Sequence, residues 1–115
     1  MPVDLVYKLL ARDAWAQACA LGRFEGAPID LRDGFIHLSS GAQVQETARL
    51  HFRGQSDLLV VAFDAQRLGE ELKWEASRGG QLFPHLYGVI DPAQALWVRE
   101  APLDAEGIPQ VGVLP

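Results

Sequence analysis

Two kinds of hydrophobic spacing alternate along the chain and predict short strands next to helices. The apolar residues of 4–10 (DLVYKLL) predict a first strand. In residues 11–21 the apolar positions recur at helical spacing, and Gly22 would end this helix because glycine tolerates the left-handed conformation found there. Cys19 falls on the apolar face of the helix, so we expect it to be a small buried core residue.

A connection and a short strand are expected next. Residues 24–33 contain several turn-forming glycine, proline and aspartate residues, and we interpret them as a connection. The segment 35–39 (FIHLS) that follows predicts a strand. Because strand side chains alternate between faces, Phe35, His37 and Ser39 would share one face. This strand thus presents an imidazole and a hydroxyl group on the same side.

The middle of the chain predicts a second helix and the most deeply buried strand. Residues 40–43 (SGAQ) match a capping box, so we expect a helix to begin there and to run to about Phe52. Residues 58–63 (LLVVAF) are continuously apolar, as in a strand that is covered on both faces. Residues 64–69 are expected to form a short turn or helical piece.

The last part of the chain predicts three more extended segments. Residues 72–76 (LKWEA) alternate between apolar and charged positions and predict a strand. Pro84 removes a hydrogen-bond donor, so we expect residues 83–88 (FPHLYG) to form an extended edge segment. Residues 95–101 (ALWVREA) predict a last strand, and the glycines and prolines of 102–115 predict a loosely packed tail. The pattern predicts an α+β fold with about six short strands and two main helices.

Length and composition are typical of a single-domain soluble protein. The 115 residues suit one domain, residues 1–115, with its core over about 4–101. Contents of 49% hydrophobic and 22% charged residues exclude a disordered or fibrous chain. No segment approaches the roughly 18 apolar residues of a membrane helix, and the first ten residues lack a signal-peptide pattern. We therefore expect a cytoplasmic protein that does not bind membranes.

The charge and the single cysteine narrow the partners further. A formal net charge of −5 argues against broad binding to nucleic acids, because phosphates repel a net anion. With only Cys19, the chain can form neither an internal disulfide nor a cysteine-rich zinc site. The sequence leaves the oligomeric state open.

Histidines are the first candidates for chemistry. His37 is expected close to the start of the second helix, where free backbone amides favour anions. His85 lies between Phe83 and Tyr87 on one face of an extended segment, which suits stacking on a flat ring and hydrogen bonding to its polar edge. For both, the alternative is a structural role in the core. His51 is interpreted as a half-exposed helix residue.

Glu75 adds a candidate acid–base group, although a surface carboxylate paired with a neighbouring basic residue is the simpler interpretation. A zinc site made of His37, Glu75 and His85 would lack the short histidine spacing of such sites, so we expect no metal. A hydrolase built on Ser39 would require the absent Gly-x-Ser-x-Gly pattern. Phosphate-binding glycine loops are also absent.

Three segments resemble a known family: residues 33–39 (DGFIHLS), Trp74-Glu75 and residues 83–88 (FPHLYG). Together they resemble the small bacterial proteins classed as domain of unknown function 952, with a likeness over roughly residues 6–98. That family is grouped with the ADP-ribosyltransferase-like fold, so the resemblance implies a split antiparallel β-sheet around a cleft that holds NAD. The strand with His37 also resembles the His-x-His-[Leu/Phe]-Ser strand of RNA 2′-phosphotransferases, with Phe35 in place of their first histidine.

The resemblance implies a shared cleft with two groups of residues. The expected catalytic residues are His37, Glu75 and His85. The residues expected to contact the nucleotide are Tyr7, Ser39, Arg78 and Tyr87. In this interpretation Arg78 holds a phosphate, Tyr87 or His85 stacks on the nicotinamide, and Glu75 orients a ribose hydroxyl.

The leading hypothesis is an ADP-ribosyltransferase-like protein that binds NAD or a related nucleotide as its small-molecule partner and transfers ADP-ribose. The alternative is a non-catalytic ligand-binding or interaction module that keeps the fold. Tyr7-Lys8 stands where relatives commonly show Tyr-His, and this departure favours the alternative. A hydrolase of a small metabolite with His37 as its base ranks third.

Overall fold

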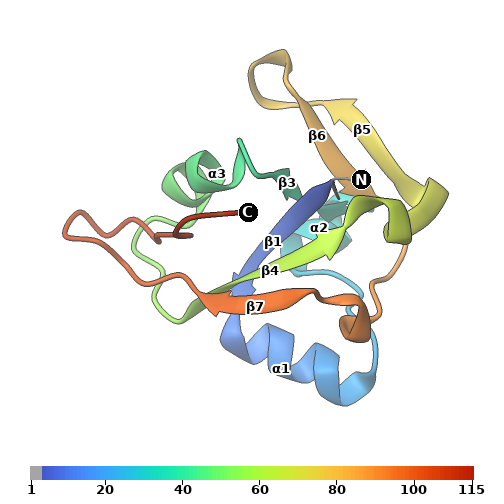
Figure 1. The fold of residues 1–115 in the computed structure, drawn as a ribbon, viewed down its shortest axis with the longest axis horizontal. Coiled ribbons are helices and arrows are strands. Elements are labelled where there is room, and N and C mark those ends of the chain that lie inside the picture. Colours follow the sequence, from blue (N-terminus) through green and yellow to red (C-terminus); the bar gives the residue numbers. More distant parts are fainter. Residues whose placement is uncertain (1–3) are drawn as a thin grey trace.

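Two antiparallel sheets form the framework of the structure, a computed structural model that describes residues 4–115 except for the side chain of Arg78. One sheet has the strand order β3-β1-β4-β7 and the other β2-β6-β5 (Figure 1). Within the described residues, the strands are β1 (Leu5–Ala11), β2 (Ile36–His37), β3 (Ser39–Ser40), β4 (Leu58–Asp64), β5 (Leu72–Ala76), β6 (Leu82–Leu86) and β7 (Trp97–Glu100). The helices are α1 (Arg12–Leu21), α2 (Pro28–Asp33) and α3 (Val44–His51), with 3-10 helices η1 (Ala65–Glu71), η2 (Arg78–Gly80) and η3 (Pro92–Gln94). The α+β class is confirmed, and no described helix is long and apolar enough to cross a membrane.

β1 and β4 form the centre of the four-stranded sheet. They pair antiparallel from Leu5 opposite Asp64 to Ala11 opposite Leu58. One face of the sheet packs against α1 and the other against α3 (Figure 1). Because both faces are covered, β4 is buried along nearly all of its length, which confirms the central strand that its continuous apolar run predicts.

Helix α1 is confirmed, and it ends at Gly22, whose φ of 86° lies in the left-handed region. Its contacts with the core come from Ala14, Trp15 and Ala18. Cys19, which we expected to be buried, is exposed. It lies at the margin of the apolar stripe, where a turn of about 100° per residue carries its side chain away from the sheet.

Helix α2 lies where the sequence predicted only a connection. Pro28 occupies the start of the helix, where its fixed φ is favourable and its missing N–H costs nothing. Asp30 in the first turn accepts a hydrogen bond from the backbone N–H of Ala27 at 2.8 Å. Gly34, with φ of 87°, ends the helix. The proline and glycine therefore mark the two ends of a short helix rather than turns.

The expected strand 35–39 is divided between the two sheets. His37 on β2 pairs with His85 on β6, whereas Ser39 on β3 pairs with Tyr7 on β1. Leu38 lies between them and its backbone N–H donates to the carbonyl of Pro84 at 3.0 Å. The segment therefore joins the two sheets, and it carries His37 and Ser39 at their junction.

β6 is the middle strand of the three-stranded sheet, so the prediction of an edge segment is wrong. The carbonyl of Pro84 points toward Leu38, and in an antiparallel ladder the nitrogen of a residue faces the same side as its carbonyl. On that side β2 has already ended at His37. The missing N–H of proline therefore removes no ladder bond to β5, and a central position is tolerated.

The segment after Ala101 contacts α3 and β7. Val111 is buried, and its backbone N–H donates to the side-chain oxygen of Gln45 at 3.1 Å. The side-chain amide of Gln45 donates to the carbonyl of Pro109 at 3.0 Å. Arg99 donates to the carbonyl of Val113 at 2.8 Å. At these positions the structure differs from the loose packing expected for residues 102–115, because a single glutamine of α3 bonds the backbone at two points.

Candidate functional site

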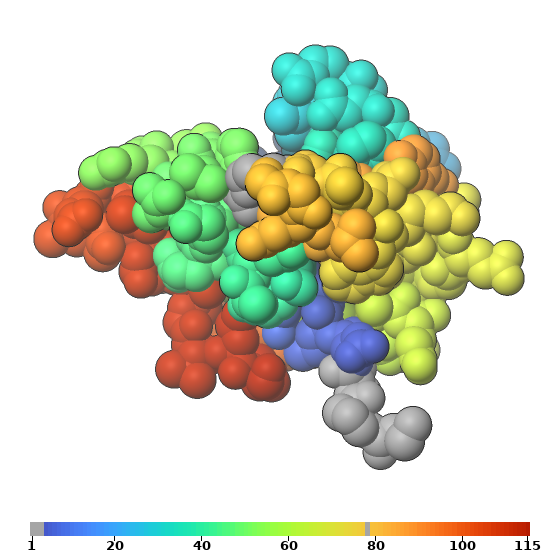
Figure 2. Space-filling view, turned by 90° about the horizontal axis from the view of Figure 1, so that it is seen from above, coloured from blue at the N-terminus to red at the C-terminus, as the bar shows by residue number. Residues whose placement is uncertain are grey.

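A cavity of about 680 Å³ lies where the two sheets, α2 and α3 meet. In Figure 2 the cyan residues of α2 stand apart from the green residues at the end of α3, with a notch between them. The polar side chains that line the cavity are Tyr7, Lys8, His37, Ser39, Thr47, His51, Gln55, Ser77 and His85. Among the described residues, the lining contains no carboxylate, although the protein carries a formal charge of −5. The cavity is therefore lined by basic side chains, while the carboxylates that pair with Lys8 and His37 belong to Asp30 and Asp33, which do not line it.

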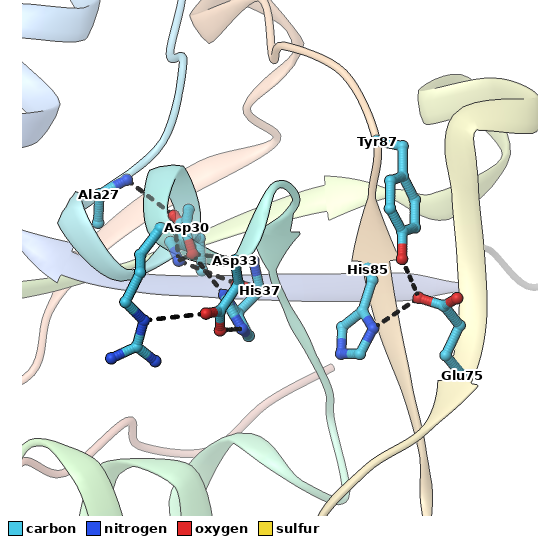
Figure 3. Close-up of polar contacts among 9 residues, drawn as sticks. Ala27, Asp30, Asp33, His37, Glu75, His85 and Tyr87 are labelled. Atoms are coloured by element: carbon cyan, nitrogen blue, oxygen red, sulfur yellow. Dashed lines mark hydrogen bonds and ion pairs between the residues drawn. The ribbon is translucent and has the colours of Figure 1, made fainter.

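His37 is held at both nitrogens of its ring. Nδ1 lies 2.7 Å from Oδ1 of Asp30, and Nε2 lies 3.0 Å from Oδ2 of Asp33 (Figure 3). An imidazole has an N–H on both nitrogens only when it is protonated. The geometry therefore matches a cationic His37 between two carboxylates of α2.

Lys8 and Asp30 form a buried ion pair behind His37. Nζ of Lys8 lies 2.9 Å from Oδ2 of Asp30 and donates to the carbonyl of His37 at 2.9 Å. Burial on its own would raise the pKa of Asp30, but the Lys8 ammonium and the hydrogen bonds from His37 and Ala27 outweigh it and hold the pKa below its ordinary value. Burial lowers the pKa of Lys8, and the charge of Asp30 opposes that shift. The pair fixes one wall of the cavity.

Asp33 lies outside the cavity lining, on the solvent side of His37. Its side chain is 30% exposed, and Oδ1 lies 3.0 Å from Nε of Arg32. The hydrogen bond from Arg32 is the main reason that the pKa of Asp33 lies below its ordinary value, and the neighbouring His37 contributes to the shift. Asp33 is thus an ionised carboxylate that Arg32 and His37 hold at the surface.

His85 is held by a carboxylate of its own. Its Nδ1 lies 2.8 Å from Oε1 of Glu75, and the same oxygen accepts a hydrogen bond from the hydroxyl of Tyr87 at 2.7 Å (Figure 3). The hydrogen bonds from Tyr87 and His85 lower the pKa of Glu75, and the bond to Glu75 raises the pKa of Tyr87. No described residue bonds Nε2 of His85, and no buried polar side-chain atom among the described residues lacks a partner. Nε2 therefore reaches the cavity, where it can accept or donate a proton.

Phe35 connects the two histidines. Its ring stacks on that of His85 with centroids 4.2 Å apart, and it lies 4.6 Å from the ring of His37 and 5.2 Å from that of Tyr87. The rings of His37 and His85 are 5.6 Å apart. The stack restricts the rotation of both imidazoles, so their nitrogens keep fixed directions.

The structure brings most of the expected site residues to one place. Tyr7, Ser39, His37 and His85 line the cavity. Glu75 and Tyr87 do not line it. Glu75 bonds His85, and the ring of Tyr87 lies against Phe35, which contacts both histidines. The side chain of Arg78 lies outside the described part of the structure. Within that part, no group of three or more His, Cys, Asp or Glu side chains is placed to hold a metal ion.

Several residues of the site have no clear signal in the sequence. The pattern of residues 24–33 indicates turns at Asp30 and Asp33, yet both contact His37. His51, interpreted as a half-exposed helix residue, lines the cavity. Pro28 followed two residues later by an acidic residue, with Gly34 beyond, is a helix-start and helix-end pattern that could have revealed α2. The pairing of Asp30 with Lys8 has no signal in the sequence.

Comparison with known proteins identifies a family whose match includes the residues of the cavity site His37 and His85. Residues 9–98 match the family described as "Protein of unknown function (DUF952)". This range covers most of the chain and includes His37, Glu75 and His85. The chain belongs to the DUF952 family. The resemblance to that family is thereby confirmed, while its placement in the ADP-ribosyltransferase-like fold stays a prediction.

Solved structures resemble this DUF952 chain over nearly its whole length. The crystal structure of protein CC0527 from Caulobacter crescentus is similar at 55% identity and a TM-score of 0.92, covering 94% of this chain and 95% of that one. The solution NMR structure of the same protein is similar at 55% identity and a TM-score of 0.84, covering 94% and 93%. No curated protein matches the chain.

Proposed function

We propose that the cavity binds NAD or a related nucleotide. The observation that carries this proposal is the lining itself, which combines three histidines and Lys8 with no described carboxylate in a protein of net charge −5. Basic side chains that face a small cavity of an acidic protein favour a small anionic ligand over a polyanion, because the rest of the surface repels the polymer. Its volume, about 680 Å³, falls within the usual range for small-molecule sites.

The remaining lining residues suit the uncharged parts of a nucleotide. Ile29, Leu38, Phe52 and Phe83 provide apolar contact for a flat ring. The side chains of Tyr7 and Ser39 line the same wall, and the Ser39 hydroxyl, which lies 3.0 Å from that of Thr47, can also bond a ribose oxygen. In this proposal the two sheets correspond to the split sheet of the ADP-ribosyltransferase-like fold.

The reaction that fits such a ligand is transfer of ADP-ribose. The bond between the nicotinamide nitrogen and the ribose carbon breaks, and nicotinamide leaves with the electron pair. An acceptor oxygen bonds to that carbon and gives up its proton, and His85 Nε2 is the proton acceptor because it reaches the cavity. Glu75 orients His85 through Nδ1 rather than a ribose hydroxyl, since Glu75 does not line the cavity.

A second candidate is a binding module without turnover. The Lys8 ammonium is bonded to Asp30 and to the carbonyl of His37, so this position serves the wall of the cavity. Such a module would bind the same nucleotide and release no nicotinamide.

Calorimetry with NAD, ADP-ribose and nicotinamide, together with chromatographic detection of released nicotinamide, tests both candidates. Binding with release that His85→Ala abolishes supports the enzyme, and binding without release supports the module. Asp91→Asn is the matched control, because Asp91 caps η3 away from the cavity and asparagine can keep that cap. Absence of binding at millimolar ligand, in protein shown to be folded, would overturn the proposal.

A further inference from the structure

His37 contacts two carboxylates that differ in burial, and this difference indicates two separate roles. We propose that Nε2 of His37 is a binding position for a phosphate group, that Asp33 occupies it when no ligand is bound, and that Asp30 is the positioning residue behind it. The inference rests on the proposed nucleotide site and names the group of the ligand that contacts His37.

Asp30 has the geometry of a fixed support. Its side chain is 1% exposed, and its Oδ1 contacts both Nδ1 of His37 at 2.7 Å and the backbone N–H of the same residue at 3.0 Å. Bonds from one oxygen to the ring and to the backbone of a single residue fix the direction of that ring. Lys8 neutralises the carboxylate from the other side. If Asp30 moved away from His37, the buried charge pair of Asp30 and Lys8 would be disrupted, so Asp30 is a fixed partner.

Asp33 has the geometry of an exchangeable partner. It meets Nε2 of His37 with Oδ2, while Oδ1 lies 3.0 Å from Nε of Arg32. Arg32 is 72% exposed and can follow the carboxylate, so Asp33 keeps an ion pair after it releases His37. Exposed ion pairs contribute little to stability, whereas a phosphate brings more charge and more acceptor oxygens to the same nitrogen.

The surroundings of His37 favour this exchange. His37 lines the cavity beside Lys8 and His85, and apart from Asp30 and Asp33, which contact His37 from outside the lining, the described lining brings no carboxylate to it. Lys8 and a protonated His37 balance the charges of Asp30 and Asp33 in the empty site. When Asp33 withdraws, the phosphate takes its place at Nε2. Asp33 competes with the anion, whereas Asp30 fixes the ring that would bind it, so the two carboxylates should affect anion binding in opposite directions.

Calorimetric titration with inorganic pyrophosphate, run in parallel with NAD, tests the proposal. Asp33→Asn removes the competing carboxylate and should tighten pyrophosphate binding about two- to fivefold, the size expected for an exposed ion pair. Asp30→Asn should weaken it by at least about tenfold, because His37 loses the carboxylate that fixes the direction of its ring. Asp91→Asn changes the net charge by the same amount at a site that does not line the cavity, and should leave the affinity unchanged.

A second measurement reports on the histidine directly. In nitrogen NMR of the wild-type protein, added pyrophosphate should shift the signal of His37 Nε2 more than that of Nδ1, which stays on Asp30. If the two aspartates had only a structural role, added pyrophosphate would not shift the Nε2 signal more than the Nδ1 signal. Should Asp30→Asn fail to fold, Asp33→Asn and this signal decide the matter.

Several results would overturn the inference: no binding of millimolar pyrophosphate, unchanged or weaker binding by Asp33→Asn, or equal tightening by Asp91→Asn. The outcomes also separate it from the proposed function. Opposite effects on pyrophosphate with no binding of NAD would support the phosphate position and overturn the nucleotide site. Binding of NAD with no effect of Asp33→Asn on either ligand would support the nucleotide site and overturn the phosphate position.

Discussion

His37 and His85 lie directly opposite each other on paired strands, with their rings 5.6 Å apart, and each donates its Nδ1 to a different carboxylate. Asp30 of α2 holds the first and Glu75 of β5 holds the second. Phe35 packs against both rings, and the carboxylates add a hydrogen-bond partner for each Nδ1. Together these contacts fix the two rings, so the cavity has two nitrogen groups with defined positions.

The bond between Tyr87 and Glu75 can be detected by titration of the phenol. Glu75 raises the pKa of Tyr87 above the ordinary 10.0, because ionising the phenol would place a second negative charge beside the carboxylate. Glu75→Gln should lower the pKa of Tyr87 toward that value. The measurement is the tyrosinate absorbance as a function of pH in a Tyr7→Phe background, which leaves Tyr87 as the single tyrosine of the chain.

The control for that titration is Glu70→Gln. It removes the same charge from η1, the element that precedes β5 in the chain. A midpoint that Glu75→Gln does not change would show that the hydrogen bond is absent in solution. An equal change with Glu70→Gln would indicate a general effect of charge.

The Lys8–Asp30 pair should be strongly coupled in stability. Lys8→Met or Asp30→Asn alone leaves a buried group without its charge partner, and each should lower the free energy of unfolding by about 3–5 kcal/mol. The double variant should lose less than the sum of the two, by at least about 1 kcal/mol, because neither charge remains. Urea denaturation of the four proteins measures the coupling.

An exposed pair provides the comparison for this cycle. Arg12 and Asp57 lie 2.8 Å apart near the protein surface, with 44% and 66% of their side chains exposed. Arg12→Met and Asp57→Asn should each change the free energy of unfolding far less than the variants of the buried pair do, because exposed ion pairs contribute little to stability. Equal losses in the two cycles would contradict the assignment of Lys8–Asp30 as a buried pair.

The sequence predicted the elements that local patterns determine. The continuous apolar run of β4 and the spacing of α1 were sufficient to place a buried strand and the helix beside it. The period of two around His37 and Ser39 also placed both residues on one side, and both line the cavity although their strands belong to different sheets.

The rest depends on contacts between distant residues. Asp30 becomes a buried ion-pair partner only because the fold brings it to within 2.9 Å of Lys8 on β1. Pro84 is tolerated in a central strand only because β2 ends beside it. Neither the partner of a buried aspartate nor the position of a strand within a sheet can be derived from local spacing alone.

The exposure of Cys19 gives a direct test of how α1 lies on the sheet. Since the thiol is exposed at the margin of the helix, a thiol reagent should label Cys19 in the native protein nearly as fast as in urea. Cys19→Ser should change the free energy of unfolding by no more than about 0.5 kcal/mol, as is usual for surface positions. Protection of the thiol in the native state would show that the helix is rotated toward the core.

Acid should reveal the contribution of Asp30. Its pKa is lower in the folded protein than the ordinary 3.8, so the unfolded chain binds the proton more readily. The stabilisation from its ionised form is therefore complete above pH 3.8 and is lost as the pH falls through the folded-state pKa. Lys8 is protonated in both states over this range and does not contribute to the slope.

The measurement is the free energy of unfolding from urea titrations between neutral pH and the acid limit of the fold, for the wild type and for Asp30→Asn. The wild type should lose its advantage over the variant as the pH falls, because a protonated Asp30 no longer pairs with the Lys8 ammonium. Asp91→Asn should keep the acid loss of the wild type, since Asp91 has no buried cationic partner among the described residues. A constant difference between wild type and Asp30→Asn down to the lowest pH would mean that the carboxylate is not held ionised by Lys8 and His37.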